Sequence, residues 1–121
     1  MRFLSMIRIE ENTGKVPSEK LMRDMGKLIE ELNRAGQLIS TAGLRPTSEG
    51  VRLRLHRGKL SMVDGPFTET KEVIGGYAII EANSKEEAIE LTQRFLNVHG
   101  DEWDIECEVR QLDGPDCGRE T

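Results

Sequence analysis

"RFLSMIRIE", residues 2–10, decides the fold, because it is almost continuously apolar from Phe3 to Ile9. A strand with one solvent-exposed face alternates between apolar and polar residues, whereas a strand covered on both faces is an almost unbroken apolar run. The stretch therefore predicts a central strand of a sheet. Other parts of the fold must cover both of its faces.

Two helices are predicted on either side of a central segment. Ser18 can cap the first helix and Gly36 can end it. The second helix runs to about residue 98, and Ser84 with Glu87 forms a capping box at its start. Apolar side chains at helical spacing predict the buried stripes. These are Leu21, Met22, Met25, Leu28, Ile29 and Leu32 in the first helix, and Ala88, Leu91 and Phe95, with Leu96 as a further candidate, in the second.

The remaining strands are predicted over residues 37–44, 51–56, 60–63, 74–82 and 102–111, of which 51–56 and 60–63 form a hairpin. The order is strand, helix, strand, inserted hairpin, strand, helix, strand. This order is typical of an α+β ferredoxin-like split βαβ sandwich. We expect a single domain over residues 1–112 and a flexible C-terminal tail over 113–121.

Two helices can cover only one face of such a sheet, yet the first strand is apolar on both. A second copy of the chain is the simplest cover for the other face. The sequence therefore predicts a homodimer whose sheets meet face to face.

Composition and charge exclude several classes of protein. The 121 residues carry a net charge of -5, which argues against direct binding of nucleic acid. No apolar run reaches the roughly 20 residues of a membrane helix, and the N-terminal segment becomes charged too early for a signal peptide. We expect a soluble, cytoplasmic protein that does not bind membranes.

No metal site or cofactor is predicted. Cys107 and Cys117 lack metal-ligand spacing, and so do His56 and His99. The phosphate-binding, dinucleotide-binding and nucleophile-elbow motifs are also absent from the sequence.

The stretch "VDGPFTETKEVIGGYAII", residues 63–80, carries more polar side chains than a connecting turn needs. Asp64 either accepts backbone N–H groups of the turn or acts at the mouth of a cleft. A positive φ at Gly65 and an anchoring role for Phe67 are the structural interpretations. Gly75, beside Gly76 in a strand, indicates either a β-bulge or the close approach of a ligand.

The same stretch also carries a family resemblance. "DGPFTETKEVIGGYAIIE" and the preceding "AGLRP" resemble the DGPF-domain proteins, a branch of the YCII-related family, and the similarity extends from the first strand to Val109. The resemblance implies a ferredoxin-like fold that dimerises into an α/β barrel, with a cleft between sheet and helices. It also implies genes that often lie beside those of extracytoplasmic-function sigma factors.

The resemblance does not carry over the chemistry proposed for the wider family. That chemistry uses a His and Asp pair with the histidine on the first helix, whereas residues 18–36 contain no histidine. A general base of that kind therefore has no counterpart here.

We expect the protein to bind a small polar or anionic molecule in a cleft beside the DGPF loop. If it is an enzyme, cofactor-free proton transfer or elimination is the simplest chemistry, with Asp64 as base and Lys71 holding the negative charge of the substrate. The other predicted ligand-binding residues are Thr70, Arg45, Tyr77 and Phe67. The alternative is a non-catalytic regulatory or accessory protein acting with a sigma-factor-type transcription system.

Overall fold

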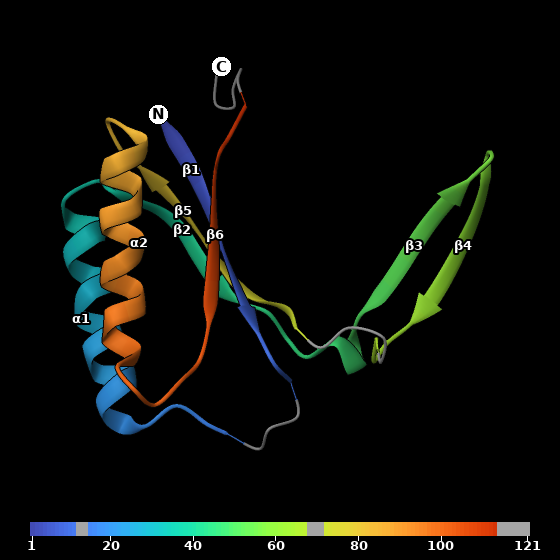
Figure 1. Ribbon diagram of the computed structural model, residues 1–121, viewed down its shortest axis with the longest axis horizontal. Helices are drawn as coiled ribbons and strands as arrows, with labels where there is room; N and C mark the ends of the chain where they lie inside the picture. Colours follow the sequence, from blue (N-terminus) through green and yellow to red (C-terminus); the bar gives the residue numbers. More distant parts are fainter. Residues whose placement is uncertain (12–14, 68–71, 114–121) are drawn as a thin grey trace.

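The computed structural model describes residues 1–11, 15–67 and 72–113 (Figure 1). Its elements are β1 (Arg2–Ile9), α1 (Glu19–Arg34), β2 (Leu38–Gly43), the 3-10 helix η1 (Thr47–Glu49), β3 (Val51–His56), β4 (Lys59–Asp64), β5 (Val73–Glu81), α2 (Lys85–His99) and β6 (Glu106–Gln111). This order confirms the predicted succession of strands, helices and inserted hairpin. The fold is α+β, with two helices and antiparallel sheets.

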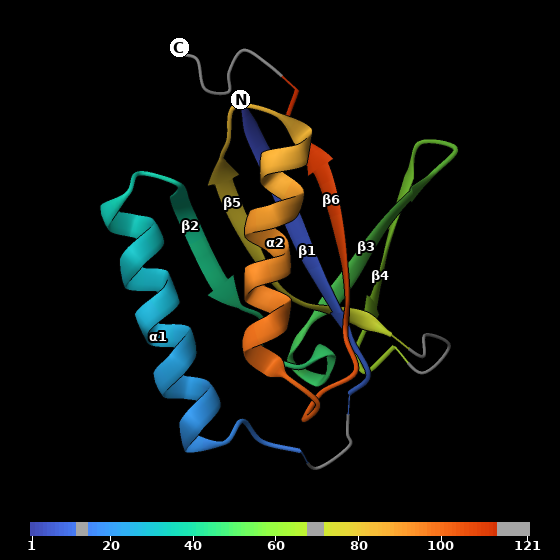
Figure 2. The same ribbon diagram turned by 60° about the vertical axis from the view of Figure 1, so that its left-hand side comes forward.

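The main sheet has four strands in the order β2-β5-β1-β6, and all neighbours are antiparallel. β1 is an inner strand, as its apolar sequence predicts. Both helices lie on one face of this sheet (Figures 1 and 2). The arrangement is compatible with a ferredoxin-like fold.

The hydrophobic core lies between the sheet and the helices. Phe3, Leu32 and Ile80 are its largest fully buried side chains. Met25 and Ile29 are partly buried against the core. The prediction that Met22 is buried is wrong, because its side chain lies at the edge of the helical stripe and is 63% exposed.

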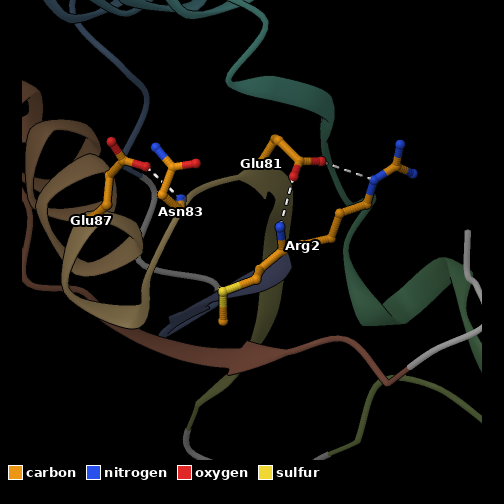
Figure 3. Close-up of polar contacts among 5 residues, drawn as sticks. Arg2, Glu81, Asn83 and Glu87 are labelled. Carbon is orange, nitrogen blue, oxygen red and sulfur yellow. Dashed lines mark hydrogen bonds and ion pairs between the residues drawn. The ribbon is translucent and has the colours of Figure 1, made fainter.

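The predicted helix caps are present. The Ser18 hydroxyl accepts a hydrogen bond from the Leu21 N–H at 3.0 Å, and Gly36 follows α1 with a φ of 75°. The Ser84 hydroxyl accepts from the Glu87 N–H at 3.1 Å. The Glu87 carboxylate accepts from the Asn83 N–H at 2.6 Å, one residue before the partner that a standard capping box predicts (Figure 3).

Side chains of β1 alternate between the two faces of the sheet. Phe3 and Ser5 are buried toward the helices, and the Ser5 hydroxyl lies 2.8 Å from the Thr92 hydroxyl of α2. Leu4 and Met6 have the opposite parity and point to the face without helices. This second face of the sheet, hereafter the open face, is not covered by either helix (Figure 1).

The open face has an apolar centre and a charged rim. The centre consists of the half-buried side chains of Leu4, Met6, Tyr77 and Ile79. At the rim, the Glu81 carboxylate lies 2.8 Å from the N-terminal amine and 3.3 Å from Arg2 Nε (Figure 3). The hydrogen bond from the N-terminal amine, followed by that from Arg2, lowers the pKa of Glu81.

A β-bulge interrupts the pairing of β5 with β1. Ile7 pairs with Gly76 and Arg8 with Ile74, so Gly75 is the extra residue. A Cβ at Gly75 would lie 2.4 Å from the Cδ1 of Ile9. The bulge that the paired glycines indicated is therefore present.

β3 and β4 form a separate hairpin, hereafter the arm (residues 51–64). Arg57 and Gly58 make its turn with φ values of 50° and 79°. The arm projects away from the body on the side opposite the helices (Figures 1 and 2). It starts near the end of the open face and diverges from it.

Three further predictions concern the cysteines, metal sites and membrane-spanning helices. Cys107 is a free, half-buried thiol, and burial raises its pKa. Cys117 and the rest of 114–121 lie outside the described residues. Over the described ranges, no three His, Cys, Asp or Glu side chains are grouped to hold a metal ion. Neither described helix is long and apolar enough to span a bilayer.

Candidate functional site

A cavity of about 420 Å³ lies at the foot of the arm. The end of the main sheet, the segment before η1 and the first residues of β3 form its walls. Its described lining residues are Arg8, Leu44, Arg45, Pro46, Thr47, Gly50, Val51, Arg52, Phe67, Glu72, Val73 and Ile74. It is hereafter called the foot cavity.

A carboxylate at the end of β1 fixes one wall of the foot cavity. The Glu11 carboxylate accepts hydrogen bonds from the Thr47 N–H at 2.7 Å and from the Thr47 hydroxyl at 2.6 Å. These charge-assisted bonds hold η1 against the sheet. Glu11 was not predicted from the sequence, because nothing near it indicates a partner 36 residues further along the chain.

Gly65 of the DGPF motif fixes the return of the arm to the body. Its N–H donates to the Gly50 carbonyl at 3.0 Å, and the Gly65–Pro66 peptide bond is cis. A Cβ at Gly65 would lie 1.7 Å from the Thr47 carbonyl oxygen. The proposed positive φ is wrong, since Gly65 is not among the positive-φ glycines. Glycine is required here because two backbone segments approach closely.

Asp64 is the last residue of β4, where it pairs with Val51. Its side chain is exposed and does not line the foot cavity. Within the described part of the chain its carboxylate has no hydrogen bond or ion pair. The structure therefore brings Asp64 neither into a turn cap nor into the cavity.

Of the predicted residues that the structure describes, Phe67 and Arg45 line the foot cavity. The Phe67 ring lies under the Arg52 guanidinium, 3.9 Å from centroid to Cζ. Arg45 makes two hydrogen bonds to the Glu49 carboxylate, at 3.0 and 2.8 Å. These bonds raise the pKa of Arg45 and lower that of Glu49.

The other predicted residues lie elsewhere. The Tyr77 hydroxyl lies on the open face, 3.0 Å from the Ser40 hydroxyl, and is not part of the cavity wall. Thr70 and Lys71 lie outside the described residues.

Arg8 is a lining residue that the sequence analysis missed. Its guanidinium makes two long ion pairs, with Glu72 at 3.8 Å and with Glu108 at 4.0 Å. A charged side chain inside an otherwise apolar strand was the signal that could have identified it. With Arg45 and Arg52, it gives the described lining three guanidinium groups and one carboxylate, and the carboxylates of Glu49 and Glu108, which pair with Arg45 and Arg8, lie outside that lining.

A smaller cavity of about 240 Å³ adjoins the foot cavity and shares with it Leu44, Arg45, Pro46, Val73 and Ile74. The Trp103 indole forms part of its wall, and the Lys15 ammonium lies 5.2 Å from the ring centroid. The indole N–H is buried and has no hydrogen-bond partner within the described residues.

Comparison with known proteins identifies the family. Residues 1–104 match the model of the YCII-related domain. The chain is also 34% identical over 86 residues to an uncharacterized protein of Rhizobium meliloti (strain 1021), an alignment that covers 71% of this chain and 69% of that protein. The DGPF branch remains a prediction from the motif at residues 64–67. Because the match to that domain model spans most of its length, the chain belongs to the YCII-related family.

Proposed function

We propose that the protein binds a small anionic molecule in the foot cavity. The observation that supports this is the gathering of Arg8, Arg45 and Arg52 around one cavity in a chain whose net charge is -5. Guanidinium groups bind carboxylates and phosphates through two parallel hydrogen bonds. The volume of about 420 Å³ lies in the range of small-molecule sites, roughly 300–1,000 Å³.

The rest of the lining sets the shape of the ligand. Leu44, Val73 and Ile74 provide an apolar wall, and the Phe67 ring lies opposite a cation. A ligand with an anionic group and a compact apolar part satisfies both kinds of surface. Small aromatic or branched carboxylates and phosphates are therefore the first compounds to test.

The described lining of the foot cavity supports ligand binding but not catalysis. The described lining contains no histidine or cysteine, and Glu72 is its one carboxylate. The predicted base, Asp64, lies outside the cavity wall, and Lys71 lies outside the described residues. Cofactor-free proton transfer or elimination by these two residues stays a prediction.

A thermal-shift and calorimetric screen of these compounds tests the binding proposal. A ligand at about 100 times its dissociation constant adds about 2.7 kcal/mol of stability. We expect Arg45→Gln and Arg52→Gln to weaken binding at least about tenfold, the loss of one charge-assisted contact. Arg23→Gln, which removes the same charge from α1, is the matched control and should bind normally. Equal losses in all three variants, or no stabilising compound, would contradict the proposal.

We further propose that the open face pairs with a second copy, giving the homodimeric barrel that the sequence predicts. The apolar centre of Leu4, Met6, Tyr77 and Ile79 supports this pairing, because neither helix covers it. Sedimentation equilibrium should show a dimer for the wild type and a folded monomer for Ile79→Glu. A wild type that is monomeric at micromolar concentrations would contradict it. The sigma-factor-type accessory role rests on the family resemblance alone.

A further inference from the structure

The smaller cavity beside the foot cavity, hereafter the side cavity, shares one wall with it. That wall consists of residues from the segment before η1 and from the start of β5. The side cavity has a volume of about 240 Å³, which is below the roughly 300 Å³ at which small-molecule sites begin. A space of this size suits one part of a ligand that is held in the adjoining foot cavity.

The β-bulge shapes the side cavity. Gly75, the extra residue of the bulge, and Ile9, the last residue of β1, both line it. A Cβ at Gly75 would lie 2.4 Å from the Cδ1 of Ile9, so the Ile9 side chain takes up space that the glycine leaves. Neither residue is among the described lining residues of the foot cavity. A substitution at Ile9 therefore changes the side cavity alone.

The charges of the side cavity oppose a second anionic group. Glu10 and Glu11, which follow β1, both line it. Lys15 is the described cation that lines it without also lining the foot cavity, and its ammonium already donates a hydrogen bond to the Glu102 carbonyl. The Arg45 guanidinium belongs to the shared wall. The anionic group of a ligand is therefore expected in the foot cavity, and an uncharged group is expected in the side cavity.

The rest of the side cavity is apolar. Ile9, Leu44, Ile74 and Trp103 contribute to its wall. The indole N–H of Trp103 is buried, so it is not offered to a ligand in the cavity. Surface of this kind favours hydrocarbon, because contact with it removes apolar area of the ligand from water.

We propose that the ligand of the foot cavity carries an uncharged apolar tail, which extends past the shared wall and lies against Trp103 in the side cavity. The ligand class is thus a carboxylate or phosphate with an extended alkyl or aryl chain. A compact anion would fill the foot cavity alone. This inference rests on the proposed function and assigns a second compartment to the same site.

A series of unbranched carboxylates tests the tail, because butanoate, hexanoate and octanoate share one head group. In isothermal titration calorimetry, we expect affinity to rise about fourfold for each methylene that enters the side cavity. Arg52→Gln should weaken the binding of all three, since it removes a contact to the head group. If octanoate binds no more tightly than butanoate while both depend on Arg52, the tail is overturned and the foot-cavity proposal stands. If none of the three binds, the tail is also overturned, and the screen of phosphates and other carboxylates decides the foot-cavity proposal.

The same exchange at two isoleucines provides matched variants. Ile9→Phe places a larger ring beside the side cavity and should remove the affinity gained between butanoate and octanoate, while butanoate binds as it does to the wild type. Ile89→Phe makes the exchange on α2, where Ile89 is 37% exposed and lines neither cavity, and should leave the whole series unchanged. Circular dichroism verifies that both variants fold. A full gain from butanoate to octanoate in folded Ile9→Phe would overturn the proposal.

The intrinsic fluorescence of the wild type provides a test that needs no variant. Trp103 is the single tryptophan of the chain, so its emission reports on the side cavity. A tail that lies against Trp103 displaces water and should shift the emission to shorter wavelength and reduce quenching by acrylamide. Octanoate should produce both changes, and butanoate should produce neither. Identical emission and quenching with saturating octanoate and without it would overturn the proposal.

Discussion

The body and the arm of this protein use the same amphipathic strand pattern with opposite outcomes. In the body, Phe3 and Ile80 lie under two helices and are fully buried. In the arm, Leu53 and Leu60 have no cover and stay mostly exposed. The alternation of apolar residues therefore predicts which side chains share a face. Whether that face is buried within one copy depends on which other elements lie against it.

The largest effect should come from truncating one leucine in each region. Leu32→Ala, in the fully buried core, should lower the free energy of unfolding by about 2–5 kcal/mol. Leu60→Ala, at 78% exposure, should change it by less than about 0.5 kcal/mol under dilute, monomeric conditions. Urea denaturation measures both. Similar losses would mean that the arm is already covered within one copy.

The junction of the two regions should be the next most sensitive site. Gly65→Ala places a methyl group against the Thr47 carbonyl and should destabilise the protein by about 1–3 kcal/mol. Gly26→Ala is the control, because a Cβ there meets nothing within 4 Å and should stabilise α1 by about 0.5–1 kcal/mol. A neutral Gly65→Ala would show that the arm is not fixed to η1. Thermal unfolding of both variants decides between these results.

A buried hydroxyl pair joins the two layers of the body and has no counterpart in the arm. Ser5→Ala leaves the Thr92 hydroxyl buried without its partner and should cost about 1 kcal/mol. Adding Thr92→Val removes the unpaired group, so the double variant should lose less than the sum of the single losses. Additive losses in a urea double-mutant cycle would exclude an interaction between the two hydroxyls.

The smallest effect should come from the rim of the open face. The folded-state pKa of Glu81 lies below its ordinary value, so its contribution to stability is present above the ordinary pKa of about 4.3 and is lost as pH falls through the folded-state pKa. Because the contact is exposed, Glu81→Gln should cost at most about 1 kcal/mol at neutral pH. The difference in stability between variant and wild type, measured by denaturation, should therefore shrink as pH falls below the ordinary pKa of Glu81. If the difference in the free energy of unfolding between Glu81→Gln and the wild type does not change with pH, the lowered pKa of Glu81 is contradicted.

The sequence predicts the body well because its signals are local. The central position of β1, the Ser18 and Ser84 caps and the bulge at Gly75 each follow from a few neighbouring residues. Met22 was predicted wrongly because helical spacing does not define the width of the surface that the sheet covers. Local sequence patterns therefore identify helices, strands and caps more reliably than they identify which side chains are buried.

The candidate site was less predictable because its residues come from distant parts of the chain. Arg45 and Phe67 were identified from a motif, but Arg8 and Glu11 reach the same region from β1 and its end. The residues that Arg8 and Glu11 contact depend on how the sheet and η1 are arranged in the fold. The sequence predicted a site at Asp64, whereas the close backbone contact that the structure shows in this motif is at Gly65, and the Asp64 side chain lies outside the wall of the foot cavity.

The extra residue, Gly75, changes which side chains of β5 point to each face of the sheet. Before the bulge, Ile74 pairs with Arg8 and lines the foot cavity, whereas after it Tyr77 and Ile79 take the open face. In an uninterrupted strand, Ile74 would have the same parity as Gly76 and Ala78 and would point toward the helices. One inserted glycine thus lets a single strand serve two surfaces, a wall of the foot cavity at one end and a proposed subunit contact at the other. A substitution on one side of Gly75 can therefore change one of these two surfaces without changing the other.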